Sequence, residues 1–241
     1  MRNRKTGVSN VTAVSAPDDL TALGEYALRY VKPGFTLGLG TGRAANAFIR
    51  ALAKSGLKVR GVPTSNASAA LARELGIKVV TLADAERLDV AFDGADEVDP
   101  RLNLIKGYGG AMVREKVVAQ AARRFVVLVG AEKMVKRLGE RGKLPVEVLP
   151  FAAPFCARRI KALGLRPKVR LKDDGTALLS DNGNLILDCG IVRISGLARL
   201  ERELISIPGV VGTGLFVAMA NKVLVAAADG RVRELSRAKS R

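Results

Sequence analysis

Strand-forming and helix-forming segments alternate along the first half of this sequence, and that alternation limits the possible folds more than any other feature. Short apolar runs predict strands at 35–40, 59–63, 78–81, 88–92 and 125–129. Helical spacing of apolar residues predicts helices at 19–30, 44–55, 68–75 and 113–122. Units in which strand, helix and strand follow one another predict a parallel sheet with right-handed crossovers. We therefore expect an α/β fold with a Rossmann-like parallel sheet.

The pattern changes near Lys143. Strands are expected at 146–149, 168–171 and 185–188, and helices at 155–163 and 200–205. Segment 191–194 either extends the preceding strand or begins a further element. A strand of parallel-sheet character returns at 222–226. The sequence thus predicts an α/β catalytic domain from 17–142 and 218–241, an inserted smaller α+β domain at 143–217, and a flexible basic tail at 1–16.

Composition places the chain among proteins that fold without disulfide bonds. Its 241 residues are 48% hydrophobic, which allows a sizeable buried core. The two cysteines, Cys156 and Cys189, are far apart and are expected to be free thiols in a reducing compartment. No apolar run reaches the roughly 20 residues of a membrane-spanning helix, and no signal-peptide core follows the basic N-terminus. We expect a cytoplasmic protein without a membrane partner.

The net charge of +17 raises the question of nucleic-acid binding. Basic residues are spread along the chain, and part of the excess lies at its two ends. Aromatic residues make up only 4% and tryptophan is absent, so platforms for stacking bases are scarce. No nucleic-acid partner is expected, and an anionic small substrate explains the charge more simply.

Acidic residues and a lysine gather where the predicted strand 88–92 ends. Asp93 and Asp96 enclose a Gly-Ala pair, Lys106 precedes a glycine turn, and Glu115 lies in the first turns of the next helix. Because the chain has no histidine, proton transfer near neutral pH has to use carboxylates, lysines or other groups with shifted pKa values. These four residues are the catalytic candidates.

Two loops after neighbouring strands are candidates for binding. The first, Gly38-Leu39-Gly40-Thr41-Gly42-Arg43, joins a strand to a helix, where backbone N–H groups and the helix dipole favour an anion. It matches neither a dinucleotide fingerprint nor a Walker loop. The second loop supplies Thr64 and Ser65. Tight packing and helix capping are the alternative explanations, but both loops share the sheet edge where ligands bind in such folds.

At this point the sequence resembles the ribose-5-phosphate isomerase A family. The resemblance covers about residues 18 to 230, and its most specific motif is the run Asp93-Gly94-Ala95-Asp96-Glu97. The other matching segments are Gly38–Gly42, Thr64-Ser65, Lys106-Gly107, Gly109-Gly110-Ala111, Arg114-Glu115-Lys116, Leu144–Ala152, Ser180–Asn184 and Ile207–Val211.

The resemblance implies interconversion of ribose 5-phosphate and ribulose 5-phosphate in the non-oxidative pentose phosphate pathway, without a metal or an organic cofactor. By resemblance, Glu115 carries a proton between two carbons through an enediolate, and Lys106 stabilises the developing oxyanion. Asp93 handles hydroxyl protons and ring opening, and Asp96 orients the sugar. Substrate contacts are implied for Gly40, Thr41, Gly42, Arg43, Thr64, Ser65, Gly107, Gly109 and Lys133. The resemblance also implies a homodimer or homotetramer.

Departures from the family pattern gather at the expected phosphate end. Arg43-Ala44 stands where the family has Ser-Thr, Thr21 stands in place of a lysine, and Tyr108 interrupts the glycine run. The Arg43 guanidinium can replace the missing hydroxyl and lysine contacts to the phosphate with one pair of charge-assisted hydrogen bonds. A Tyr108 side chain that points inward would narrow the pocket. Two alternatives therefore stay open: an isomerase of another sugar or sugar phosphate, and a non-catalytic module that binds a sugar phosphate.

Overall fold

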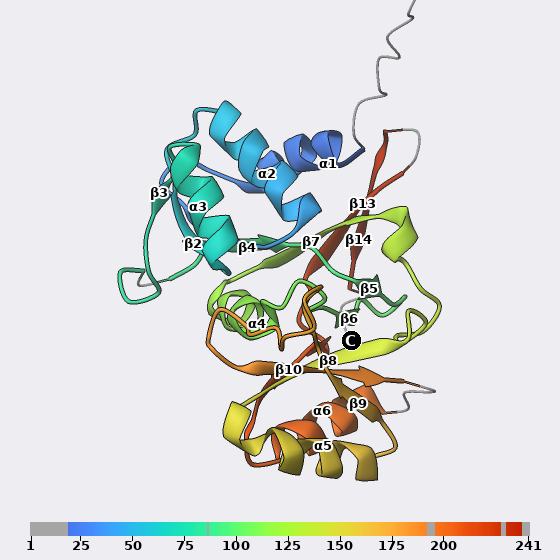
Figure 1. The fold of residues 1–241 in the computed structure, drawn as a ribbon. Helices are drawn as coiled ribbons and strands as arrows, with labels where there is room; N and C mark the ends of the chain where they lie inside the picture. Colours follow the sequence, from blue (N-terminus) through green and yellow to red (C-terminus); the bar gives the residue numbers. More distant parts are fainter. Residues whose placement is uncertain (1–18, 86, 192–195, 228–229, 238–241) are drawn as a thin grey trace, which may run out of the picture.

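A seven-stranded sheet forms the centre of the larger part of the molecule (Figure 1). The structure is a computed structural model that describes residues 19–85, 87–191, 196–227 and 230–237. The sheet has the order β14-β13-β7-β4-β1-β2-β3, and only the edge strand β14 runs antiparallel to its neighbour. Its strands are β1 (Thr36–Leu39), β2 (Arg60–Pro63), β3 (Lys78–Val79), β4 (Val90–Asp93), β7 (Phe125–Gly130), β13 (Lys222–Ala226) and β14 (Val232–Ser236).

Helices cover both faces of this sheet. One face carries α1 (Asp19–Ala27), continued by η1 (Leu28–Tyr30), together with α2 (Arg43–Lys54) and α3 (Asn66–Glu74); α4 (Met112–Ala121) lies on the other (Figure 1). Successive side chains of each strand point to opposite faces of the sheet, so the sheet packs against both helix layers. Phe92 of β4 stacks on Phe48 of α2 with ring centroids 4.0 Å apart. A Cβ at Gly38 of β1 would lie 2.5 Å from Cγ1 of Val118 in α4, so glycine allows that helix to approach closely.

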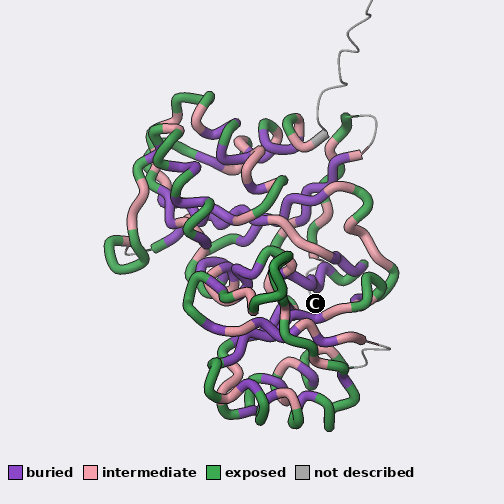
Figure 2. Tube along the Cα trace, in the orientation of Figure 1, coloured by how far each residue is buried: buried purple, intermediate pink, exposed green. Residues whose placement is uncertain are grey.

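A second, antiparallel sheet lies beyond α4 (Figure 1). Its order is β11-β8-β10-β9, from β8 (Lys143–Val148), β9 (Arg166–Val169), β10 (Leu185–Gly190) and β11 (Val210–Thr213). Helices α5 (Ala153–Ala162) and α6 (Leu197–Ile205) pack on it around Cys156, Ile160 and Leu204. The short helices η2 (Ala131–Lys133) and η3 (Pro150–Ala152) follow β7 and β8. Figure 2 shows that buried residues run through both sheets.

A small three-stranded sheet joins the two parts. It has the order β12-β6-β5, from β5 (Glu97–Val98), β6 (Leu104–Ile105) and β12 (Leu215–Phe216). Strand β12 follows the antiparallel sheet in sequence but pairs with β6, which precedes it by more than 100 residues. Lys106 directly follows β6, so this pairing fixes the position of a candidate catalytic residue.

The predicted fold class is confirmed. The sheet is parallel where predicted, and strand 222–226 returns beside β7 in parallel register. The structure adds the short strands β5, β6, β11 and β12, and the polar edge strand β14, which the sequence pattern did not reveal. Helix α6 begins at Leu197, three residues earlier than expected. The sequence left two assignments open for segment 191–194. Of these residues only Ile191 is among those that the structure describes, and it lies outside any strand.

The division into domains stays a proposal. We propose 17–142 with 218–241 as one domain and 143–217 as the inserted one, because β13 and β14 rejoin the large sheet after the antiparallel sheet is complete. The tail at 1–16 lies outside the described residues.

Cys156 and Cys189 are both buried and unpaired. Among the described residues, no helix is long and apolar enough to cross a membrane.

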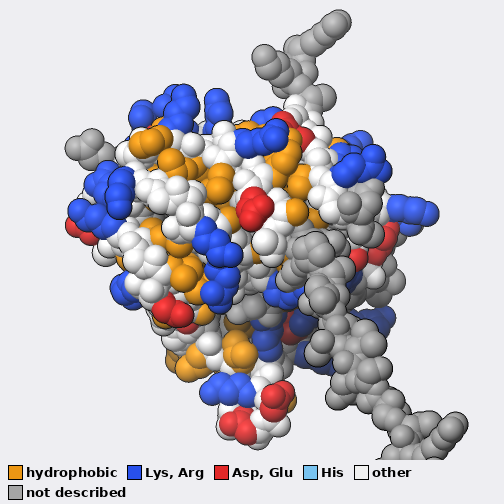
Figure 3. Space-filling model, turned by 90° about the horizontal axis from the view of Figure 1, so that it is seen from above, with side chains coloured by type: hydrophobic (Ala, Val, Ile, Leu, Met, Phe, Trp, Pro, Cys, Tyr) orange, Lys and Arg blue, Asp and Glu red, His pale blue; other side chains and the backbone are white. Residues whose placement is uncertain are grey.

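Basic side chains do not form one continuous patch on the face seen in Figure 3. Lys and Arg are scattered over it among apolar and neutral side chains. This distribution agrees with the scattered positions of basic residues in the sequence.

Candidate active site

A buried lysine between two carboxylates is the centre of the site. The ammonium nitrogen of Lys106 lies 3.2 Å from Oδ2 of Asp93 and 3.1 Å from Oε2 of Glu115. It also donates a hydrogen bond to the carbonyl of Gly94, at 2.5 Å. All three ionisable side chains are at most 6% exposed. The fold brings them together from the end of β4, the end of β6 and the first turn of α4.

Burial shifts the proton affinities of this group. It raises the pKa of Glu115 to about 8; the nearby Asp93 adds to the rise, and Lys106 opposes it. Burial also raises the pKa of Asp93, against the effect of Lys106 and of two backbone N–H groups. Although burial alone would lower the pKa of Lys106, the two carboxylates raise it above its usual value. The result is a permanent cation beside a carboxylate with a proton affinity suited to transfer near neutral pH.

The glycine loop after β1 holds Asp93 in place. The backbone N–H groups of Thr41 and Gly94 donate to Oδ1 of Asp93 at 3.0 and 2.7 Å. A Cβ at Gly40 would lie 2.3 Å from Cγ of Asp93, so only glycine fits at that position. Gly40 therefore makes room for the aspartate instead of lining the cavity, and Oδ2 of Asp93 is left to face Lys106.

The second loop supports the first. The Thr41 hydroxyl lies 2.8 Å from the hydroxyls of both Thr64 and Ser65. Ser65 also caps α3, where it forms a capping box with Ser68. Thr64 and Ser65 are buried and are not among the residues lining the cavity described below. Their contacts with the Thr41 hydroxyl hold the loop after β1 in place from the side away from the cavity lining.

A cavity of about 180 Å³ opens over the lysine and the glutamate. Of the residues predicted to form the site, it is lined by Thr41, Gly42, Arg43, Asp96, Lys106, Gly107, Gly109, Glu115 and Lys133. Arg43 is exposed at the first turn of α2, and Lys133 is the last residue of η2, which follows β7. The cavity thus has a buried acid–base pair at its floor and two cations at its rim.

Several lining residues were not predicted as site residues. They are Leu20, Ala44, Gly94, Ala95, Leu128, Val129, Gly130 and Glu132. Gly94 and Ala95 lie inside the Asp93–Asp96 motif, so the motif itself was the signal that could have included them. Leu20 comes from α1, and nothing in its sequence context distinguishes it from an ordinary core position.

Tyr108 points away from the cavity. Its hydroxyl donates to the carbonyl of Lys143 at 3.3 Å, and the Lys143 ammonium lies 4.6 Å from the centre of its ring. Its backbone N–H donates to Oδ2 of Asp96 at 2.9 Å. The tyrosine packs against the core of the antiparallel sheet, so it does not narrow the pocket as an inward tyrosine would.

The comparison with known proteins agrees with this geometry. The model of the family described as ribose 5-phosphate isomerase A (phosphoriboisomerase A) matches residues 60–230. The chain belongs to this family. It is 52% identical to a ribose-5-phosphate isomerase A from Roseiflexus sp. (strain RS-1) over 213 residues, covering 86% of this chain and 91% of the relative. A Thermomicrobium roseum relative of the same name is 46% identical, over 88% of this chain and 92% of its own.

Solved structures of the family have the same fold. Ribose 5-phosphate isomerase A from Methanocaldococcus jannaschii is 41% identical with a TM-score of 0.85, covering 90% of this chain and 98% of that one. A D-ribose-5-phosphate isomerase in complex with phospho-erythronic acid is 35% identical with a TM-score of 0.87, covering 91% and 98%.

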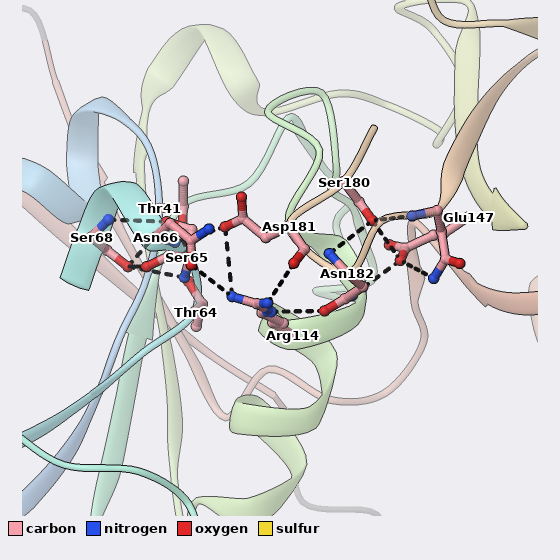
Figure 4. A network of polar contacts seen from close by, with 11 residues as sticks. Thr41, Thr64, Ser65, Asn66, Ser68, Arg114, Glu147, Ser180, Asp181 and Asn182 are labelled. Carbon is pink, nitrogen blue, oxygen red and sulfur yellow. Dashed lines mark hydrogen bonds and ion pairs between the residues drawn. The ribbon is translucent and has the colours of Figure 1, made fainter. Parts of the chain in front are cut away.

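A polar network connects the family motifs at the back of the site (Figure 4). Arg114, next to Glu115 on α4, donates to Oδ1 of Asn182 at 2.8 Å and to the carbonyl of Asp181 at 2.6 Å. It also reaches Asn66 at the start of α3. The buried Glu147 accepts hydrogen bonds from Ser180, Asn182 and Asn184. The 180–184 turn is thereby held between the two sheets, against the helix that carries Glu115.

Replacement of Glu115 by glutamine should change how stability depends on pH. In the folded protein the pKa of Glu115 is raised to about 8, so the carboxyl keeps its proton while the unfolded chain loses one. Wild-type stability is therefore reduced as pH rises from about 4.5 to about 8. The stability of Glu115→Gln relative to wild type should increase over that window, as measured by urea unfolding at pH 5 and pH 8.

The matched control is Glu74→Gln, since Glu74 is exposed at the end of α3. Its difference from wild type should be the same at both pH values. A difference for Glu115→Gln that stays constant from pH 5 to pH 8 would contradict a raised pKa for this group.

Proposed function

We propose that this protein interconverts ribose 5-phosphate and ribulose 5-phosphate through an enediolate. The observation that carries the proposal is the Lys106–Glu115 pair, 3.1 Å apart and buried at the floor of the cavity. Moving a proton between neighbouring carbons needs a positioned base with a pKa near the working pH. The carbonyl oxygen of the sugar gains negative charge in that step, and a buried cation stabilises that charge. Membership of the isomerase family supports the same reaction.

Each charged group has a role in this proposal. Glu115 removes the proton from C2 and returns it to C1. This transfer requires the carboxylate to lie within reach of both carbons, on one face of the enediolate. Lys106 lies beside the oxygens and stabilises the enediolate. Asp93 is not among the residues that line the cavity but faces Lys106 through Oδ2; its proposed role is to move hydroxyl protons and to assist ring opening. Asp96 has one oxygen engaged by the N–H of Tyr108 and orients the sugar with the rest of its carboxylate.

The phosphate is proposed to lie at the rim of the cavity. Arg43 and Lys133 supply positive charge there, and the N-terminus of α2 begins at Arg43, so its free N–H groups and helix dipole favour an anion. A relative with 35% identity binds phospho-erythronic acid, a phosphorylated sugar acid. The outward position of Tyr108 removes one reason to expect a different substrate.

Purified Glu115→Gln should lose almost all turnover of ribose 5-phosphate. Loss of a general base lowers kcat by about 10²- to 10⁴-fold, and KM should change little because glutamine keeps the shape of the side chain. In wild type, kcat/KM should rise with pH through about pH 8, where Glu115 loses its proton. Steady-state rates between pH 6 and pH 9 test both points, with Glu74→Gln as the control. Full activity in Glu115→Gln would refute the assignment.

Removal of the Arg43 guanidinium should weaken binding more than chemistry. A hydrogen bond to a charged group contributes about 1.5–3 kcal/mol, so Arg43→Ala should raise KM for ribose 5-phosphate by roughly 10- to 100-fold at similar kcat. Arg50→Ala is the matched control, since Arg50 is exposed on the same helix outside the cavity. Unphosphorylated ribose should be a poor substrate for both variants and wild type. An unchanged KM in Arg43→Ala would exclude Arg43 from the phosphate site.

We also propose that the protein is a cytoplasmic homodimer or homotetramer. The buried, unpaired thiols suit a reducing compartment. The association is supported by an exposed apolar segment after β8: Phe151 is 99% exposed, and Leu149 and Phe155 nearby are also exposed. Exposed apolar groups of this kind commonly mark contact surfaces.

Phe151→Ser should therefore shift the protein toward smaller species in size-exclusion chromatography with light scattering. Leu171→Ser, at an exposed leucine outside this segment, should leave the mass unchanged. A wild-type protein that is monomeric at micromolar concentration would contradict the proposal.

A further inference from the structure

Arg170, just after β9, reaches from the antiparallel sheet into the turn that follows Lys106. Its Nη1 donates to the carbonyls of Gly107 and Tyr108, both at 2.9 Å. On its other side, Nε and Nη2 donate to the two carboxylate oxygens of Asp188 in β10, at 3.0 and 2.5 Å. The side chain is only 9% exposed. One guanidinium thus joins a rigid strand of one sheet to two consecutive carbonyls of the turn.

Asp188 provides a firm anchor for this arginine. It also accepts a hydrogen bond from the Lys143 ammonium at 3.1 Å, and Lys143 lies over the ring of Tyr108. Although burial alone would raise the pKa of Asp188, the hydrogen bonds from Arg170 and Lys143 hold it below its usual value. The carboxylate therefore stays ionised, and the fork of Arg170 is fixed in a bidentate geometry that a lysine cannot reproduce.

The turn needs an external restraint. Three of the residues in this turn are glycines, Gly107, Gly109 and Gly110. Glycine loses more conformational freedom on folding than any other residue. Gly107 and Gly110 have φ values of +102° and +87°. Its internal closure is one hydrogen bond, from the N–H of Gly110 to the carbonyl of Gly107 at 3.0 Å. Lys106 precedes this turn, and α4 with Glu115 follows it.

We propose that Arg170 is a positioning residue for the isomerisation: it fixes the Gly107–Gly110 turn and thereby the distance between Lys106 and Glu115. Arg170 is not among the residues that line the cavity, so its proposed role acts through the turn. The inference rests on the proposed function, because it assigns Arg170 to the geometry of that reaction. The competing explanation is that Arg170 only holds the two sheets together.

The two explanations differ in their effect on Glu115. Lys106 from β6 and Asp93 from β4 face this carboxylate, with Asp96 further away. If the turn loosens, Lys106 moves relative to Glu115 and the favourable ion pair weakens. The pKa of Glu115 then rises, so the acid limb of the kcat profile shifts to higher pH. A residue that only joins the sheets would change thermal stability and leave this limb in place.

The experiment compares wild type with Arg170→Gln, Arg170→Lys and the control Lys172→Gln, which removes an exposed cation two residues along the same segment. Steady-state kinetics on ribose 5-phosphate between pH 6 and pH 9 give kcat, KM and the acid limb, and thermal unfolding gives stability. Displacement of catalytic groups by about 1 Å can reduce the rate about 100-fold. We expect kcat of Arg170→Gln to fall by roughly 10- to 100-fold, with KM within about threefold and the acid limb moved upward.

Arg170→Lys should fall between wild type and Arg170→Gln, since it keeps the charge but loses the fork, and Lys172→Gln should behave as wild type. Wild-type kcat in a folded Arg170 variant would overturn the proposal, as would a reduced kcat with an unmoved acid limb. If Arg170→Gln does not fold, the same readouts on Arg170→Lys decide. An inactive wild type would refute the proposed function instead, which separates the two failures.

Discussion

The burial of the Lys106 ammonium between Asp93 and Glu115 is the constraint on which the rest of the site depends. Breaking a buried ion pair by removing one partner costs about 3–5 kcal/mol, because the other charge is left without compensation. The surrounding fold supplies that compensation from separate elements: an N–H group from Thr41 in the loop after β1, the N–H group and the carbonyl of Gly94 after β4, and carboxylates from β4 and α4. None of these elements can shift alone without exposing or isolating a charge.

Helix α4 couples the two sheets because consecutive residues on it point in different directions. Glu115 faces Lys106 at the edge of the parallel sheet, while Arg114 faces the 180–184 turn of the antiparallel sheet. Arg170 makes the reverse connection, from the antiparallel sheet to the turn after Lys106. Two arginines, one from each part of the molecule, therefore connect the smaller part to the site, although its strands do not line the cavity.

The sequence was sufficient for the parallel sheet and for the main groups of the site, since periodicity and short motifs are local signals. Asp93, Lys106 and Glu115 were predicted and lie together. The directions in which side chains point were not predictable, because they depend on partners far away in the sequence. Tyr108 finds its hydroxyl partner 35 residues away, and Arg170 bonds to Gly107 across 63 residues. The substrate contacts of Thr64 and Ser65 stay predictions, and the contacts of their hydroxyls with Thr41 were not predicted from the sequence. Strand β14 was missed because its residues are mostly polar, although it forms an antiparallel hairpin with β13, the strand directly before it in the sequence.

The two edges of the seven-stranded sheet bear on how copies of the chain can meet. At one edge, β3 is only two residues long. At the other, β14 carries Arg233 and Glu234, and Glu234 is paired with Lys222 and Tyr30. Short strands and charged side chains discourage edge-to-edge pairing. The large sheet is therefore protected from growing into a continuous intermolecular sheet, and concentrated protein avoids that route to aggregation.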